Sequence, residues 1–116
     1  MKPCLNLWLE NDGEVVFSIW RMKLLQAVGE TGSISGAAAV MDTHYRTAWE
    51  KINEMETRLG RSWWKPRLGA AWRGAALTPL AQNLIVAFAQ FNQEMAQQME
   101  ERFTAVLAPL LENFPK

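Results

Sequence analysis

The stretch Gly32–Gly60, GSISGAAAVMDTHYRTAWEKINEMETRLG, decides the fold of this chain. Ser33 follows a glycine directly, so a residue that often ends a helix is followed at once by one that often begins the next. A short helix is expected at about residues 34–40, where a Gly-Ala-Ala-Ala run lets another helix come close. Asp42 and Thr43 interrupt the pattern, and we expect them to cap a second helix.

The second helix carries one apolar stripe. Its apolar residues recur at spacings of three and four, as in an amphipathic helix, and are Ala48, Trp49, Ile52, Met55 and Leu59. At about 100° per residue, Arg46, Glu50 and Asn53 face the opposite way, and Thr47 lies on the flank. A buried stripe with a polar outer face at the N-terminal end is typical of a helix that enters a DNA major groove. An ordinary helical hairpin in a core has the same periodicity, so periodicity alone leaves both interpretations open.

A family resemblance favours the DNA-binding interpretation. The matching runs are TGSIS at 31–35, the alanine pair at 37–38, YRTAW at 45–49, INEM at 52–55 and LTPL at 77–80. At this spacing they resemble the N-terminal DNA-binding domain of the ModE family of molybdate-responsive regulators, which is related to the winged helix-turn-helix of LysR-type regulators. The similarity extends over roughly residues 4–95. It implies a mainly α fold with a small β component, namely a winged helix-turn-helix with a long C-terminal dimerisation helix.

Size and composition fit one small domain. A chain of 116 residues supports one core that buries about two-thirds of its unfolded surface. Hydrophobic residues make up 49% and charged residues 21%, and neither a membrane-spanning run nor a secretory signal pattern is present in the sequence. One cysteine, Cys4, excludes an internal disulfide and fits a cytoplasmic location. We expect a winged helix-turn-helix over residues 1–77, with a helical dimerisation segment over 78–116 packed against it.

The formal net charge is zero, whereas a DNA-binding domain usually has a basic footprint. Residues 43–77 hold seven Lys or Arg and three Glu, a net charge of +4, and the segments 1–42 and 78–116 each carry −2. Positive charge is therefore concentrated where the recognition helix and wing are expected, and the acidic ends should face away from phosphate. Chance clustering is the competing interpretation.

Two further elements are expected before this stretch. Residues 5–10 follow a strand pattern, and the Asn-Asp-Gly run at 11–13 is a strong turn signal, so residues 14–17 are predicted to form a return strand. The family resemblance implies that the N-terminal strand joins the small sheet that includes the wing. Ser18 is expected to cap a helix over about residues 19–30, against which the helix-turn-helix packs.

Residues 61–77, RSWWKPRLGAAWRGAAL, are expected to form a β-hairpin wing with strands near 63–67 and 75–77. The family wing is a run of glycines, whereas this one keeps two. Three tryptophans appear instead, at Trp63, Trp64 and Trp72. Exposed rings could stack on unpaired bases or anchor a protein partner. The other interpretation is that they cover the small sheet and the neighbouring helix.

Thr78 and Pro79 predict the start of a last helix, because proline at the first turn costs no hydrogen bond. The helix is expected to run to about Leu107, with Pro109 bending or ending it. A helix of this length is too long for a compact lone domain unless it packs on a second chain. The predicted dimer interface consists of apolar residues along it: Leu84, Phe88, Phe91, Met95, Met99 and Phe103.

The predicted DNA contacts lie on the helix-turn-helix and the wing. Ser33 and Ser35 begin the helix that crosses the DNA backbone and could donate to phosphates, with helix capping as their alternative role. Arg46 is expected to pair with guanine, and its alternative is a salt bridge with Glu50. The remaining candidates are base-edge contacts, phosphate contacts by basic side chains, and a phosphate contact by the hydroxyl of Tyr45, which is expected nearer the buried side. The full set of predicted DNA-contacting residues is Ser33, Ser35, His44, Tyr45, Arg46, Thr47, Lys51, Lys65, Arg67 and Arg73.

No enzyme class fits the sequence. One His and one Cys cannot supply the four ligands of a structural zinc site, and no phosphate-loop or dinucleotide glycine pattern is present. The molybdate-binding domain of the ModE family would lie C-terminal to this region, so no molybdate binding and no cofactor are expected. The sequence predicts a stand-alone, dimeric transcriptional regulator that reads an inverted repeat in double-stranded DNA. The alternative is a protein-interaction module that keeps the fold but has weak or lost DNA binding.

Overall fold

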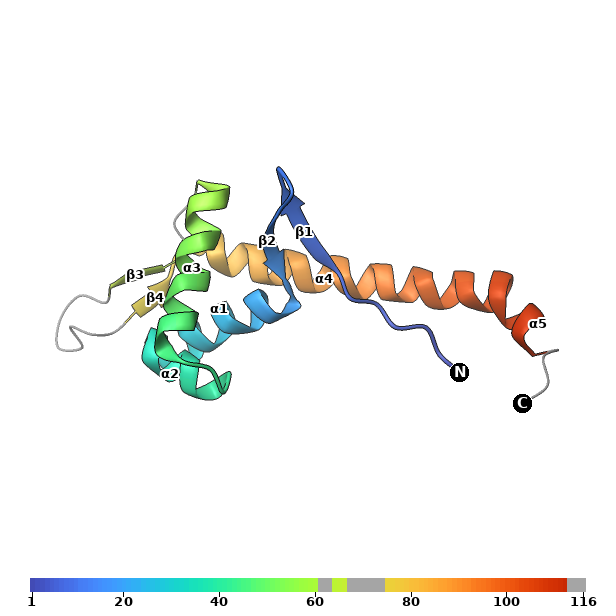
Figure 1. The fold of residues 1–116 in the computed structure, drawn as a ribbon, viewed down its shortest axis with the longest axis horizontal. Coiled ribbons are helices and arrows are strands. Elements are labelled where there is room, and N and C mark those ends of the chain that lie inside the picture. The colour runs from blue at the N-terminus through green and yellow to red at the C-terminus, as the bar shows by residue number, and fades with distance from the viewer. Residues whose placement is uncertain (61–63, 67–74, 113–116) are drawn as a thin grey trace.

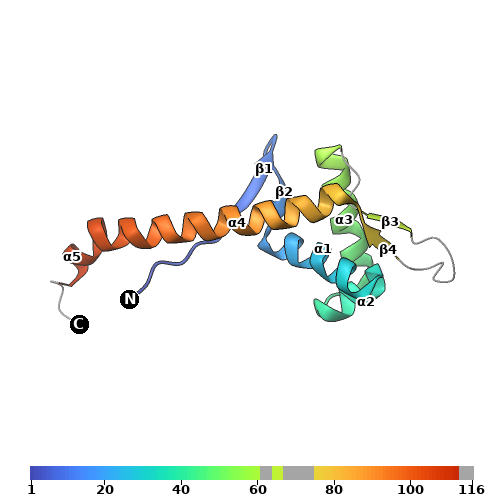
Figure 2. The ribbon, with the colours of Figure 1, turned by 180° about the vertical axis from the view of Figure 1, so that it is seen from behind.

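The computed structural model describes residues 1–60, 64–66 and 75–112. Figures 1 and 2 show a cluster of short elements at one end of a long helix that projects away from it as a rod. The molecule measures 63 × 27 × 23 Å. In chain order the elements are β1 (Trp8–Asn11), β2 (Glu14–Ser18), α1 (Ile19–Thr31), α2 (Ile34–Val40), α3 (Tyr45–Leu59), β3 (Trp64–Pro66), β4 (Ala75–Leu77), α4 (Pro79–Arg102), a π-helical segment (Phe103–Leu107) and α5 (Ala108–Leu111).

Three helices begin at the predicted caps. The hydroxyls of Ser18, Ser33 and Thr78 each accept a hydrogen bond from the backbone N–H three residues ahead, at 3.2, 2.8 and 3.2 Å. Each bond satisfies a first-turn N–H that has no partner within its helix. Between α1 and α2, Gly32 adopts a left-handed φ of 77° and donates its N–H to the Val28 carbonyl. The sequence therefore predicted these boundaries to within one residue.

The start of α3 differs from the prediction that Asp42 and Thr43 cap it. The N-cap is His44, and its side chain makes no capping hydrogen bond. Asp42 instead adopts a left-handed φ of 51°, a conformation that its short polar side chain tolerates. Its N–H and that of Thr43 bond back to carbonyls of α2, at 3.2 and 3.0 Å. These two residues therefore complete the turn after α2, and the His44 imidazole is not used as a cap.

The core lies where α1, α2, α3, β2 and the first turns of α4 meet. Leu24, Leu25 and Ile52 are fully buried in it. Phe17 packs edge-on against Phe88, with ring centroids 4.9 Å apart and an interplanar angle of 89°. Phe88 is 3% exposed in the single chain, so its predicted place in a dimer interface is wrong. The helical period does not distinguish the turns of α4 that cover their own domain from the turns that project beyond it.

The strands form two separate two-stranded antiparallel sheets, β1–β2 and β3–β4. The prediction that the N-terminal strand joins the wing sheet is therefore wrong. The helices keep the sheets apart, because β2 packs on α3 and α1 whereas β4 packs on α1 and α4. In the first hairpin, Asp12 and Gly13 have φ values of 52° and 81°, as a tight turn matched to strand twist requires.

The long helix continues beyond its predicted end. After α4 the backbone passes through the π-helical segment, where the Ala108 N–H bonds to the Phe103 carbonyl, and then into α5. Pro109 was expected to bend or end the helix. In the structure the helix instead widens into a π turn just before Pro109. Proline has no N–H for the carbonyl four residues earlier, and a π turn accommodates the missing bond without ending the helix.

Candidate DNA-binding interface

Small side chains bring α2 against α1 and α3. Ala37 and Ala38 are 0% and 3% exposed. A Cβ at Gly36 would lie 2.7 Å from the Thr31 Cβ, so the α1–α2 corner has no room for a side chain there. The apolar stripe of α3, here Ala48, Ile52 and Met55, is fully buried against these helices. Packing of α3 by this stripe leaves its opposite face open.

The first turns of α3 are open to solvent. The Arg46 side chain is 89% exposed, and His44 and Ser35 are also exposed. Tyr45 was expected nearer the buried side, but it is 55% exposed, so the open face at this end is wider than predicted. Thr47 is half-buried on the flank. Within α3, Arg46 Nε donates to Glu50 Oε1 at 3.2 Å, which is the salt bridge that the sequence offered as an alternative role.

Trp49 does not belong to the buried stripe of α3. The sequence predicted that it packs there beside Ala48, but its side chain is 44% exposed. Because neighbouring helical positions are about 100° apart, a stripe narrow enough to bury Ala48 fully leaves the next ring at its margin. Asn53 is half-buried and donates from Nδ2 to the Trp49 carbonyl at 2.7 Å. Trp49 therefore adds an aromatic surface that sequence reasoning missed.

Arg21 is a buried cation that the sequence analysis did not single out. It lies on α1 and is 7% exposed. Its Nη2 lies 3.1 Å from Glu54 Oε2, and its Nη1 donates to the Lys51 carbonyl at 3.3 Å. Both partners are on α3, so this guanidinium joins the two helices. The sequence signal was a single arginine among apolar residues of α1, which does not identify a partner 33 residues away.

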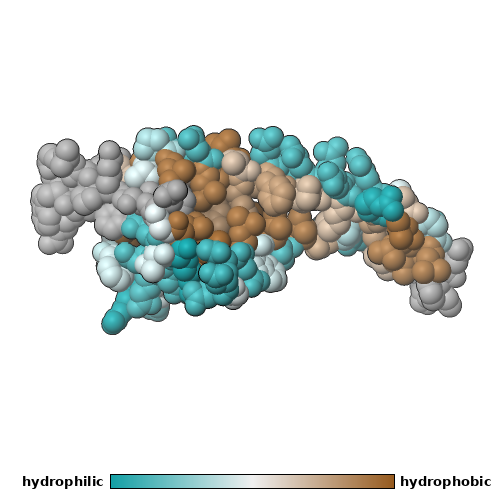
Figure 3. All heavy atoms as spheres, turned by 90° about the horizontal axis from the view of Figure 1, so that it is seen from above, coloured by the Kyte–Doolittle hydropathy of each residue, from teal (hydrophilic) through white to brown (hydrophobic). Residues whose placement is uncertain are grey.

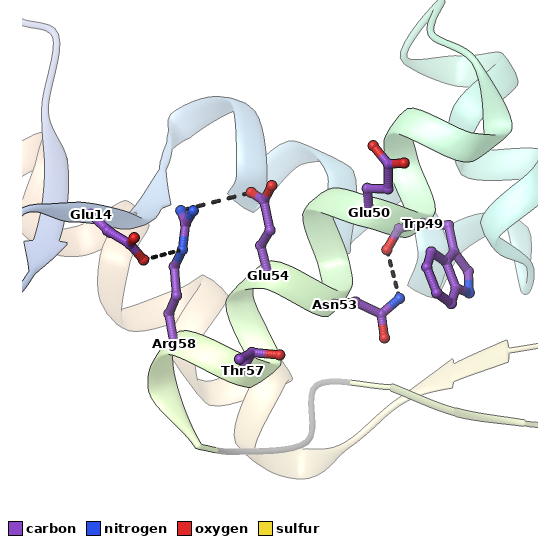
Figure 4. Close-up of a pocket in the computed structure, with 7 residues that line it drawn as sticks. All are labelled: Glu14, Trp49, Glu50, Asn53, Glu54, Thr57 and Arg58. Carbon is purple, nitrogen blue, oxygen red and sulfur yellow. Dashed lines mark hydrogen bonds and ion pairs between the residues drawn. The ribbon is translucent and has the colours of Figure 1, made fainter.

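A second arginine extends this ion-pair network to the first hairpin. Arg58 Nε lies 3.0 Å from Glu14 Oε2, and Arg58 also donates to the Val15 carbonyl and lies 3.7 Å from Glu54 (Figure 4). Burial acts to raise the pKa of Glu54, but the hydrogen bond from Arg21 and the nearby cations outweigh it and hold the pKa below its ordinary value of 4.5. The network fixes the C-terminal half of α3.

This network engages some of the cations behind the basic footprint inferred from the charge count. Lys51 Nζ lies 3.5 Å from Glu54 Oε2, so a predicted phosphate contact already shares its charge with a carboxylate. Arg58 is likewise compensated by Glu14 and Glu54. The +4 of residues 43–77 already counts Glu54, and Arg21 and Glu14 from outside that segment cancel, so the network leaves this net charge unchanged and engages two of its seven cations, Lys51 and Arg58, inside the protein.

The wing strands pair as predicted, with Trp64 opposite Leu77, Lys65 opposite Ala76 and Pro66 opposite Ala75. The predicted contacts Arg67 and Arg73 lie outside the described residues, as do Trp63 and Trp72. Within the described part, no group of three or more His, Cys, Asp or Glu is placed to hold a metal ion. No helix there is both long and apolar enough to cross a membrane.

The family of the chain follows from residues 19–82, which run from α1 to the start of α4. They match the model of the bacterial regulatory helix-turn-helix proteins of the lysR family. The match covers more than half of the chain, so the chain belongs to this family. With the observed helix-turn-helix and β3–β4 wing, this places the chain in the class of winged helix-turn-helix proteins of that family.

The chain is also similar to known proteins in sequence and in fold. The chain is 36% identical over 78 residues to the molybdenum-pterin-binding protein MopB of Rhodobacter capsulatus, a match that covers 66% of this chain and 29% of MopB. The DNA-binding domain of CbnR, solved in complex with DNA, has a TM-score of 0.56 at 21% identity, covering 77% of this chain and 97% of that one. Full-length LysG of Corynebacterium glutamicum has a TM-score of 0.52 at 18% identity, covering 82% and 30%. At these identities the two structures show the fold alone.

Proposed function

We propose that this protein is a homodimeric, sequence-specific regulator that binds an inverted repeat in double-stranded DNA in the cytoplasm. The observation that carries the proposal is the open N-terminal face of α3, which is held rigidly from behind by a fully buried stripe. A recognition helix needs this combination of exposed polar side chains and a fixed position relative to the scaffold. The CbnR domain, which shares the fold, was solved with DNA, and this supports the same partner here.

The proposed contacts divide into two sets. Arg46, His44 and Thr47 are assigned to base edges, with Arg46 donating to guanine. Positioning contacts to phosphate are assigned to the start of α2, the Tyr45 hydroxyl, Lys51 and the wing, namely Ser33, Ser35, Tyr45, Lys51, Lys65, Arg67 and Arg73. The Ser33 hydroxyl already caps α2, so its phosphate contact would come from a lone hydroxyl hydrogen while its oxygen keeps the cap.

The dimer is assigned to α4 and the π-helical segment after it, from Leu84, which also packs against the core of the domain, to Phe103 on the projecting part. Phe91 is 41% exposed, and Leu84, Met95, Met99 and Phe103 are half-buried in the single chain. Figure 3 shows hydrophobic surface continuing from the domain along the rod to a patch at its far end. A hollow of about 430 Å³ is found there, with an apolar lining to which Pro3 of the N-terminal arm contributes. Soluble monomers rarely leave such a surface uncovered, and a second copy would cover both rods in one isologous contact.

The two-fold symmetry of the proposed dimer determines the symmetry of the DNA site that it binds. Two α3 helices related by a two-fold axis read half-sites that repeat in inverted order, spaced by one or more helical turns. The basic central segment of each subunit suggests roughly 4–8 phosphate contacts per dimer, so affinity should fall steeply with salt.

Selection of bound sequences from a pool of random duplexes tests the function. We expect an enriched motif with inverted-repeat symmetry. A pool that stays random, together with loss of retention on a DNA column at low salt, would identify the fold as a protein-interaction module instead. Retention that is lost in proportion to salt, without any motif, would mean DNA binding without sequence reading.

The dimer assignment is tested by Phe91→Asp, which places a charge on the exposed apolar side of α4. We expect this variant to sediment as a monomer at micromolar concentration, because an unpaired charge cannot be buried in an apolar contact. Gln93→Asp is the matched control, since Gln93 is exposed about 200° around the same helix. A wild-type monomer at that concentration, or a Phe91→Asp variant that stays dimeric, would rule out this interface.

A further inference from the structure

Glu50 places a carboxylate in the middle of the surface proposed to face DNA. Its side chain is 52% exposed and lies one helical turn after Arg46, on the same open face of α3. An exposed carboxylate near phosphate is repelled by it, so this position lowers non-specific affinity. That cost is offset where the carboxylate meets a hydrogen-bond donor in the DNA.

The next turn of the same helix provides a contrast. Glu54 is held by Arg21 at 3.1 Å and by Lys51 at 3.5 Å, so its charge is used inside the protein. Glu50 has one partner among the described residues, the Nε of Arg46, which contacts Oε1 at 3.2 Å. Glu50 is among the residues that line a hollow of about 420 Å³. Figure 4 shows it apart from the dashed contacts of Glu54 and Arg58. Its second oxygen, Oε2, is therefore available to a ligand.

The salt bridge also prepares Arg46 for guanine. Arginine has five N–H donors, and Glu50 engages the one on Nε. Both terminal nitrogens remain for the O6 and N7 acceptors of guanine, which is the commonest specific contact in the major groove. Glu50 thus orients the Arg46 guanidinium and keeps its own Oε2 as a hydrogen-bond acceptor.

Major-groove chemistry limits what Oε2 can meet. Donors there are the exocyclic amino groups of cytosine and adenine, and the pairing expected for a carboxylate is with cytosine N4. Four residues along a helix advance about 6 Å, and base pairs are about 3.4 Å apart, so Arg46 and Glu50 reach positions within about two base pairs of each other. We propose that Glu50 is a specificity-determining residue that accepts a hydrogen bond from the N4 amino group of a cytosine beside the guanine read by Arg46. The inference rests on the proposed function.

The experiment compares sequence selection from random duplexes by the wild-type chain, Glu50→Gln and Glu101→Gln. Glu101 is exposed near the far end of α4, so its change alters net charge by the same amount without touching the open face of α3. Duplexes with single substitutions in the selected motif then give the preference at each position. Circular dichroism of each variant checks that the fold is kept.

We expect the wild type to prefer cytosine about fivefold or more at one position within two base pairs of a preferred guanine. Glu50→Gln should shift that preference from cytosine towards adenine, because its amide offers a donor as well as an acceptor. Its affinity for unrelated duplex should rise, since a like charge near phosphate is removed. Glu101→Gln should keep the wild-type motif. A motif that is unchanged in Glu50→Gln, or a lost preference for a base other than cytosine, overturns this inference alone. A wild type that selects no motif overturns the proposed function and this inference together.

Discussion

The two halves of α3 contain the same pair of residue types and use them differently. Arg46 and Glu50 in the first half, and Glu54 and Arg58 in the second, are both arginine–glutamate pairs four residues apart, at 3.2 and 3.7 Å. The Arg46 side chain is 89% exposed, whereas that of Arg58 is 25% exposed. The second pair meets Arg21 and Glu14 from other elements, and the first meets none of the described residues beyond its own helix. Tertiary surroundings therefore decide that one half is available to a ligand and the other serves as an anchor.

The largest expected effect comes from removing a buried apolar side chain that holds α3 in the domain. Ile52→Ala should lower the free energy of unfolding by about 2–5 kcal/mol, because it removes a fully buried side chain and leaves a cavity. Urea denaturation at one fixed protein concentration measures this, since dimerisation shifts apparent stability. Thr57→Ala, on the exposed side of the same helix, should stay within about 0.5 kcal/mol. Equal effects of the two changes would show that α3 is not packed by this stripe.

A smaller loss is expected from the polar part of the anchor. Arg21→Ala should destabilise by about 1–3 kcal/mol, because it removes a buried cation and leaves the Lys51 carbonyl and the Glu54 carboxylate without this donor. The exposed Lys23 on the same helix is the control, and Lys23→Ala should change stability little. The same denaturation experiment gives both values. If Arg21→Ala proves as mild as its control, the ion-pair network does not hold α3 to α1.

The smallest expected effect is the dependence of stability on pH that comes from Glu54. The folded-state pKa of Glu54 lies below the ordinary value of 4.5, so its ionised form is favoured by folding. The contribution of Glu54 to the free energy of unfolding is fully present above about pH 4.5 and is lost as the pH falls through the lowered folded-state pKa. The stability difference between wild type and Glu54→Gln should therefore narrow on acidification below this value. The stability difference between wild type and Glu101→Gln, whose carboxylate is exposed, is the reference. If the difference between wild type and Glu54→Gln widens in acid, folding does not lower the pKa of Glu54.

Local signals predicted much of the fold, and contacts distant in sequence account for the errors. Ser18, Ser33 and Thr78 were predictable as caps because a cap depends on residues within one turn. Phe88 and Trp49 were misplaced because periodicity describes a helix face and does not show which neighbours cover it. The anchor was missed because the partners of Arg21 lie on another helix. At the site, the sequence identified Arg46 and its alternative partner, and it did not separate Glu50 from Glu54.

The central claim, that the first half of α3 reads DNA while the second half anchors the helix, is tested most directly by titrating a fluorescent duplex of the selected motif with Arg46→Ala. We expect a loss of about 1–3 kcal/mol in binding and a relaxed preference at one base position, because a guanine loses its bidentate donor. The free energy of unfolding should stay within about 0.5 kcal/mol, since this side chain is 89% exposed. Lys2→Ala, on the exposed N-terminal arm, removes the same charge and should leave affinity nearly unchanged. Wild-type affinity and wild-type base preference in Arg46→Ala would contradict the claim.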